Sequence, residues 1–381
     1  MVGGGWWVGV RTHHPSGNTH HAPVTYAIAA AGTGGHVFPG LAVGEALVDS
    51  GVRPEDILYI GGSRLESRVY PAAGFPFLEV EIRGLQRRRT VANVGVPVLV
   101  ASASRRIATE LRARAVGVTL GMGGYISVPA GFAARRSRVP LFVHEQNAEA
   151  GLANRMMSRS ARRVFGSFPK TQRLPRAEWV GNPIRRDLAV FDRAALRPAA
   201  LNRYGLEPDV PVVGIFGGSL GASALNRTAE SLVSLASEGT FAILHLTGSE
   251  HLEAVARAAT GFPAWRPVGF EDRMELFYAA CDLVIARAGG AVAELTATAT
   301  PAILVPGGFG SGHHQAANAG ALAAVGAAEV VEETEVARIP TLVASLLAAP
   351  DRLRAMGQAC SRLARPDAAR VIARAMTETH A

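Results

Sequence analysis

The chain has 381 residues, 48% of them hydrophobic, which is enough for two domains that each bury a core. Its formal net charge is +8, but Lys170 is the only lysine, so a lysine-dependent phosphate loop or a Schiff-base enzyme is nearly excluded. Cys281 and Cys360 form no metal-type pair, which favours a reduced, cytoplasmic protein.

In chain order, residues 1–23 show no periodicity and no signal-peptide pattern, and we expect a disordered extension there. The two uncharged stretches at 115–134 and 295–312 are interrupted by glycine and proline, so we expect no transmembrane helix. From residue 24 onward short apolar runs alternate with helical patterns, which predicts an α/β fold with parallel sheets. The expected strands are 24–30, 56–60, 116–120 and 139–143, then 210–216, 241–246, 282–286 and 302–305.

The two sets of strands predict two domains, residues 24–183 and residues 184–366, separated by a polar hinge near 183–205. The first strand runs directly into a glycine-rich turn and a helix that we expect near Pro39. Glycine turns at helix N-termini let backbone N–H groups approach phosphate. The turn reads Gly32-Thr33-Gly34-Gly35-His36, and this spacing differs from the dinucleotide fingerprint, so a nicotinamide site is disfavoured.

Two similar turns follow in the second half. One contains Gly217-Gly218-Ser219 before a helix expected around Ala222, and the other contains Gly289-Gly290 with Glu294 one turn into the next helix. Each turn taken alone is as consistent with an ordinary tight turn of an α/β fold as with a phosphate site. Their number predicts a cleft for a phosphorylated ligand, with Glu294 available to ribose hydroxyls.

Seven segments together resemble the MurG family of bacterial N-acetylglucosaminyltransferases, over roughly residues 24–380. They are GTGGHVFPG, GMGGYISVPAGFAA, HEQNAEAGLANR, GNPIR, GGSLGASALN, ARAGGAVAEL and PAILVPGGFGSGHHQAANA. The resemblance implies two Rossmann-like, doubly wound parallel-sheet domains that face a central cleft, the glycosyltransferase-B type. It also implies a final helix around 367–379, within a C-terminal segment 367–381 that returns to the first domain.

The resemblance further implies transfer of N-acetylglucosamine from its UDP donor to undecaprenyl-diphospho-N-acetylmuramoyl-pentapeptide, by direct displacement with a β-1,4 product. No metal or other cofactor is implied, and no two aspartates stand two residues apart as metal-diphosphate binding would require. The implied donor contacts are Thr33, Gly34, Gly35, Asn147, Arg185, Ser219, the backbone at Glu271, Gly290, Ala291, Val292, Ala293, Glu294 and Gln315.

The chain departs from the family pattern in two places. The turn before Glu294 is one residue shorter and lacks a threonine, which could displace that carboxylate by about 100° around its helix. The loop before Gln315 reads Gly312-His313-His314 where two aspartates are usual. A related enzyme with a natural-product acceptor, a UDP-sugar 2-epimerase and an inactive sugar-nucleotide sensor therefore stay open as alternatives.

Two residues are candidates for the general base that takes the proton of the attacking hydroxyl. His36 lies at the tip of the first turn and can titrate near neutrality. Glu145 is the second candidate, and the alternative is that it only orders its loop. Tyr125 and Ser127 are candidates for contacts with the acceptor.

Between residues 83 and 114 the chain carries eight arginines and one acid, around an apolar run that suits an interfacial helix. We expect this segment to dock on an anionic membrane, which places the protein at the inner face of the cell membrane. Partners in cell-wall synthesis are conceivable, and nucleic acid is not expected. The arginines of the predicted patch are Arg83, Arg87, Arg88, Arg89, Arg105 and Arg106.

Overall fold

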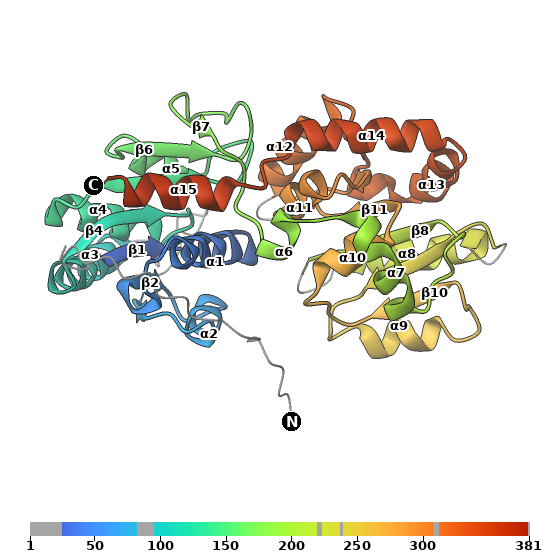
Figure 1. Ribbon diagram of the computed structural model, residues 1–381, viewed down its shortest axis with the longest axis horizontal. Coiled ribbons are helices and arrows are strands. Elements are labelled where there is room, and N and C mark those ends of the chain that lie inside the picture. The colour runs from blue at the N-terminus through green and yellow to red at the C-terminus, as the bar shows by residue number, and fades with distance from the viewer. Residues whose placement is uncertain (1–24, 82–94, 219–222, 237–238, 308–311, 380–381) are drawn as a thin grey trace.

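The computed structural model describes residues 25–81, 95–218, 223–236, 239–307 and 312–379, which form two lobes (Figure 1). The first lobe is built on a seven-stranded parallel sheet with the order β3-β2-β1-β4-β5-β6-β7. Its strands are β1 (Thr25–Ala29), β2 (Ile57–Gly61), β3 (Phe77–Glu79), β4 (Val116–Gly121), β5 (Leu141–Glu145), β6 (Arg163–Gly166) and β7 (Glu178–Trp179).

The second lobe repeats this design with a six-stranded parallel sheet in the order β10-β9-β8-β11-β12-β13. In both sheets the first strand in sequence lies inside, and the chain adds strands first on one side and then on the other, which is doubly wound topology. The strands are β8 (Val212–Phe216), β9 (Ala242–Leu246), β10 (Trp265–Val268), β11 (Leu283–Ala286), β12 (Ala302–Leu304) and β13 (Ala328–Val330).

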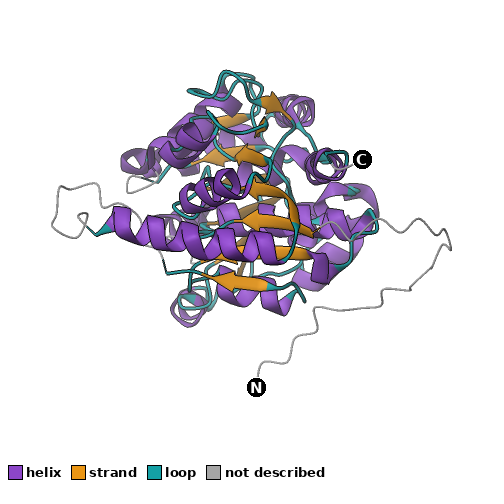
Figure 2. Cartoon of the chain, turned by 90° about the vertical axis from the view of Figure 1, so that its left-hand side faces the viewer, coloured by secondary structure: helices purple, strands orange, loops and turns teal. Residues whose placement is uncertain are grey.

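Helices cover both faces of each sheet, as Figure 2 shows for the first lobe. Every residue of β1 is buried, and alternate side chains enter different cores, Tyr26 and Ile28 on one face and Ala27 and Ala29 on the other. Burial on both faces explains why β1 is predominantly apolar and shows no alternation with polar residues.

The helices of the first lobe are α1 (Gly34–Asp49), α2 (Glu66–Ala72), α3 (Val96–Ala113), α4 (Ser127–Ser137) and α5 (Leu152–Met157). The linker and second lobe contain α6 (Arg186–Ala189), α7 (Arg193–Tyr204), α8 (Ser223–Ala236), α9 (Leu252–Ala258), α10 (Met274–Ala280), α11 (Ala291–Ala297), α12 (Gly312–Ala323), α13 (Ile339–Leu347), α14 (Pro350–Leu363) and, returning to the first lobe, α15 (Ala368–Thr377). Short 3-10 turns lie at Pro54–Asp56 and Glu333–Arg338.

The chain crosses between the lobes twice, and the two crossings touch. A side chain at Gly181, whose φ is +92°, would meet Cβ of Arg365 at 2.3 Å, so only glycine fits. The guanidinium of Arg365 stacks on Trp179 at 3.5 Å. Helix α15 then packs on α1, with Ile372 and Met376 fully buried in the core of the first lobe.

The α/β class and the two facing parallel sheets are confirmed, and each of the eight expected strands is present within two residues. The five strands without a prediction, β3, β6, β7, β10 and β13, have two to four residues and lie at or next to a sheet edge.

Two helix predictions need correction. The first helix begins at Gly34, not near Pro39, and the expected hinge residues 193–204 form α7, which packs on α10 of the second lobe. The expectation for residues 1–23 lies outside the described residues. No helix in the described part of the chain has the length and hydropathy to cross a membrane.

Candidate functional site

A cavity of about 1140 Å³ lies between the lobes, at the carboxyl ends of strands from both sheets. In doubly wound folds ligands bind at this edge, because loops and helix N-termini converge there. The lining includes residues 33–36, 123–125 and 145–147, which follow or end β1, β4 and β5. It also includes residues 216–218, 246, 248, 287 and 289–291, which follow or end β8, β9 and β11.

Two of the predicted glycine turns face each other across this cavity. A Cβ built on Gly290 would lie 3.8 Å from Cα of Gly35. Gly34 and Gly35 form the first turn of α1, and Gly290 directly precedes α11. Because the first amides of a helix have no intrahelical acceptor, both helices direct free N–H groups toward the cavity.

The amide of Gly32, by contrast, already has a partner inside the protein. The buried carboxylate of Glu66 accepts hydrogen bonds from the N–H groups of Gly32 (3.2 Å) and Gly62 (3.1 Å). Glu66 thus fixes the turn, and the N–H group of Gly32 is no longer available to a ligand. The acidic position at the start of α2 is the only sequence signal for this role.

His36 lines the cavity within the first turn of α1, and its Nδ1 lies 3.2 Å from Oγ1 of Thr33. Burial lowers the pKa of His36; nearby Glu145 and Glu66 oppose this shift, while His314 adds to it. His36 is therefore neutral at physiological pH, the state in which an imidazole can accept a proton. Its position and protonation state suit a general base.

Glu145 also borders the cavity, but its two oxygens are engaged by the loop that follows β5. The buried carboxylate accepts from N and Nδ2 of Asn147 (3.0 and 2.8 Å), N of Gly151 (3.0 Å) and Nδ2 of Asn154 (2.9 Å). This geometry assigns Glu145 to loop ordering. Of the two roles expected for Glu145, the hydrogen bonds favour loop ordering over general base, because four donors compete with any substrate proton.

Of the two residues expected to contact the acceptor, only Tyr125 lines the cavity. Tyr125 lines the cavity and covers the Gly32 turn, where its ring lies 3.4 Å from the position of a Gly32 Cβ. Ser127 is buried, and its hydroxyl both accepts from N and donates to O of Gly123 at 2.9 Å. Ser127 orders the turn and does not line the cavity, so the structure gives its predicted acceptor contact no support.

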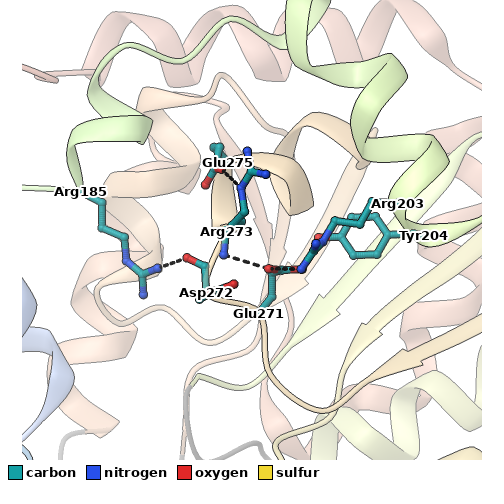
Figure 3. A network of polar contacts seen from close by, with 7 residues as sticks. All are labelled: Arg185, Arg203, Tyr204, Glu271, Asp272, Arg273 and Glu275. Atoms are coloured by element: carbon teal, nitrogen blue, oxygen red, sulfur yellow. Dashed lines mark hydrogen bonds and ion pairs between the residues drawn. The ribbon is translucent and has the colours of Figure 1, made fainter. Parts of the chain in front are cut away.

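Arg185 reaches the cavity from the start of α6. Its guanidinium lies over the ring of Phe38, 5.4 Å from the ring centroid. It also donates to the backbone carbonyl of Asp272 at 2.6 Å (Figure 3). The neighbouring Glu271 is held away from ligand: its buried carboxylate pairs with Arg203 at 3.0 Å, accepts from the hydroxyl of Tyr204 at 2.7 Å, and accepts from a backbone amide. The carboxylate is thus engaged within the protein, which leaves the expected contact to the backbone at 271.

Phe270 lines the cavity beside this backbone, and 53% of its side chain is exposed. An aromatic ring left open in a cavity offers a flat surface on which a base can stack. Sequence reasoning missed this residue, although an aromatic before the polar Glu271–Arg273 turn was a usable signal.

Glu294 lines the cavity despite the shortened turn before it. Its Oε2 accepts from the hydroxyl of Tyr278 at 2.8 Å. Burial raises the pKa of Glu294, and both Arg185 and the Tyr278 hydrogen bond act against that rise. The shortened turn therefore leaves Glu294 at the cavity.

Most other expected donor contacts also border the cavity: Thr33, Gly34, Gly35, Asn147, Gly290, Ala291 and Gln315. Val292 and Ala293 do not, since they face a smaller space between the lobes. Ser219, together with Arg83, Arg87, Arg88 and Arg89, lies outside the described residues.

Comparison with known proteins agrees with this architecture. Residues 26–166 match the glycosyltransferase family 28 N-terminal domain, and residues 212–372 match the C-terminal domain of the same family. The chain is 39% identical to a transferase of Mycolicibacterium paratuberculosis over 93% of this chain and 88% of that protein. That relative is named UDP-N-acetylglucosamine–N-acetylmuramyl-(pentapeptide) pyrophosphoryl-undecaprenol N-acetylglucosamine transferase.

A protein of Clavibacter michiganensis subsp. michiganensis with the same name is 40% identical over 90% of this chain and 93% of its own length. The crystal structure of Acinetobacter baumannii MurG superimposes with a TM-score of 0.76 and 29% identity, over 93% of this chain and all of that one. The chain belongs to the MurG family. The resemblance carried by the seven segments is thus confirmed, and the chain is a glycosyltransferase of the family 28 type.

Proposed function

We propose that the chain transfers N-acetylglucosamine from UDP-N-acetylglucosamine to undecaprenyl-diphospho-N-acetylmuramoyl-pentapeptide, forming a β-1,4 linkage. The names of two relatives state the donor, the lipid-linked acceptor and the transferred sugar, and the linkage is part of the proposal. The observation that carries the proposal is the interlobe cavity. Its lining includes neutral His36 of the first lobe, Arg185 of the linker, and Glu294 and the Gly289-Gly290 turn of the second lobe.

The second lobe and linker offer matching partners for each part of the donor. Phe270 and the backbone at 271 suit the uracil ring, and the carboxylate of Glu294 suits the ribose hydroxyls. Arg185 and the free amides at Gly34 and Gly35 suit the diphosphate, whose negative charge increases as the sugar bond breaks.

The reaction is a single displacement. The C4 hydroxyl of the acceptor attacks the anomeric carbon, its proton passes to the free ring nitrogen of His36, and the bond from that carbon to the diphosphate oxygen breaks with its electron pair leaving on UDP. Attack from the face opposite the leaving group inverts the anomeric centre. The hydrogen bond between Thr33 and Nδ1 of His36 orients the imidazole for this transfer.

This function is tested by following UDP release from UDP-N-acetylglucosamine in the presence of excess chelator. We expect UDP release that depends on a short-chain, lipid-linked muramoyl-peptide and needs no added metal, because Arg185 and helix N-termini supply the positive charge. Release at the same rate without acceptor would contradict transfer. Strict dependence on magnesium would contradict the proposal that Arg185 and helix N-termini stabilise the charge of the diphosphate without a metal.

We further propose that the first lobe docks on an anionic membrane, where the lipid tail of the acceptor resides. Helices α3, α4 and α5 pack in this order and leave large apolar side chains exposed, namely Val98, Phe132, Leu152 and Met156. Leu152 and Met156 also line the cavity. Exposed arginines on the same helices include Arg105, Arg106, Arg135 and Arg136. Exposed apolar side chains and arginines on the same helices suit a headgroup boundary.

Replacing both Arg105 and Arg106 with glutamate should therefore weaken binding to anionic vesicles by roughly tenfold or more, at about 1 kcal/mol for each arginine near the headgroups. The measurement is vesicle co-sedimentation at two salt concentrations. The matched control replaces the exposed Arg227 and Arg257 of the second lobe with glutamate, which changes the net charge equally. Equal losses in both variants would show a general charge effect and would contradict a docking face on α3.

A further inference from the structure

The loop that follows β5 in the first lobe is bonded to α12 of the second lobe, close to the cavity. Asn318, whose side chain is 1% exposed, accepts from N of Ala148 (2.8 Å) and donates to Oδ1 of Asn147 (3.2 Å) and to the carbonyl of Ala288 (3.0 Å). One turn earlier on α12, Nδ1 of His314 lies 3.1 Å from the carbonyl of Glu149. A carbonyl oxygen can only accept, so this nitrogen of His314 carries the proton.

The direction of every bond in this network is fixed. Oε1 of Glu145 accepts from the backbone N–H of Asn147, so the amide nitrogen of Asn147 also faces this oxygen and its amide oxygen faces Asn318. The backbone N–H of Ala148 in turn requires the oxygen of Asn318, which leaves the nitrogen of Asn318 for Asn147 and Ala288. Reversing either amide would set donor against donor in a buried place, at substantial cost.

The network joins the parts that the proposed donor site needs from both lobes. Ala288 directly precedes the Gly289-Gly290 turn, and Asn147 is an expected donor contact of the first lobe. Gln315 lies on α12 between His314 and Asn318, and its Oε1 accepts from N of Gly307 at 2.9 Å. Holding α12 against the loop at 147–149 therefore fixes Asn147, Gln315 and the glycine turn relative to each other.

We infer that Asn318 is a positioning residue, supported by His314, that clamps the lobes in the arrangement required for transfer. It acts through Asn147 and the 288–290 turn. Glu145 is the fixed end of the clamp in the first lobe, which accounts for its four hydrogen bonds. This inference rests on the proposed function, which supplies the two substrates that the closed lobes must bring together.

The test is the full-length Asn318→Asp variant, which is isosteric and keeps the acceptor for Ala148 but places a carboxylate against two oxygens. We expect kcat/KM for UDP-N-acetylglucosamine to fall by roughly 10²-fold. In the double variant with Asn147→Ala the two losses should be less than additive, because part of the effect of Asn318 passes through Asn147 and the rest through Ala288. His314→Ala should lose activity, and His314→Gln, which keeps a side-chain donor for Glu149, should recover part of it.

Two further measurements separate the clamp from simple destabilisation and from failure of the proposed function. Asn226→Asp changes a buried asparagine of α8, outside the cavity lining, and should reduce kcat/KM far less. Small-angle X-ray scattering with UDP-N-acetylglucosamine should show a larger radius of gyration for Asn318→Asp than for the wild type, whether or not transfer occurs. A wild type without transferase activity would contradict the function alone. Wild-type scattering from Asn318→Asp, or kcat/KM within threefold of the wild type, would overturn the clamp.

Discussion

Replacing His36 with alanine should lower kcat by roughly 10²- to 10⁴-fold, the usual contribution of a general base. UDP affinity should stay within about threefold, because the imidazole acts on the attacking hydroxyl in the transition state and not on the nucleotide. Single-turnover transfer and UDP titration measure the two quantities. His36→Gln is the matched control for packing, since it keeps hydrogen bonding but accepts no proton, and it should be nearly as slow as alanine. A parallel loss of UDP binding in both variants would contradict the base assignment.

The pH dependence of the wild type tests the same residue. Because burial lowers the pKa of His36, kcat/KM should stay level as the pH falls to the ordinary histidine value of about 6.5 and decline only below it. Since His314 contributes to this lowering, His314→Gln should raise the pKa of His36 and move the acid limb to higher pH. An acid limb that does not move would place the titrating group elsewhere.

Glu294→Ala should weaken UDP binding by roughly 1–3 kcal/mol, through loss of charge-assisted hydrogen bonds to the ribose. Isothermal titration with UDP measures the effect. Tyr278→Phe is the matched control, because it removes the hydroxyl that donates to Glu294 at 2.8 Å and leaves the carboxylate in place. We expect a smaller loss there, of about 1 kcal/mol. Unchanged UDP affinity in Glu294→Ala would show that the ribose lies away from this carboxylate.

The fold could be predicted from the sequence to the extent that its strands are buried on both faces. Strands such as β1 and β8 are predominantly apolar and are followed by glycine turns, so the hydrophobic pattern and the turn signal predict the same strand ends. The short strands β3 and β7 contain half-exposed or exposed residues and carry no such pattern. The start of α1 was misplaced because Pro39 is a helix-start signal, although here it lies in the second turn of the helix.

The cavity residues likewise divide into those that local sequence patterns predict and those that depend on contacts formed only in the folded chain. His36 and Glu294 were predictable because they stand beside glycine turns at strand ends, whereas Arg185 came only from the family resemblance of the GNPIR segment. The roles of Glu66 and Ser127 were not, because both depend on which backbone amide each oxygen meets after folding. The contact between Asn318 and Asn147 joins residues 171 positions apart, and no local pattern encodes it.

The central claim is that the interlobe cavity transfers N-acetylglucosamine onto a lipid-linked muramoyl-peptide. The most direct test incubates the full-length chain with UDP-N-acetylglucosamine and that acceptor on a short lipid, then determines the product by mass spectrometry and NMR. We expect the acceptor to gain one N-acetylhexosamine, joined by a β linkage to C4 of its muramoyl sugar, with one UDP released for each product. An unmodified acceptor beside free sugar, or an α-linked product, would contradict the proposed reaction.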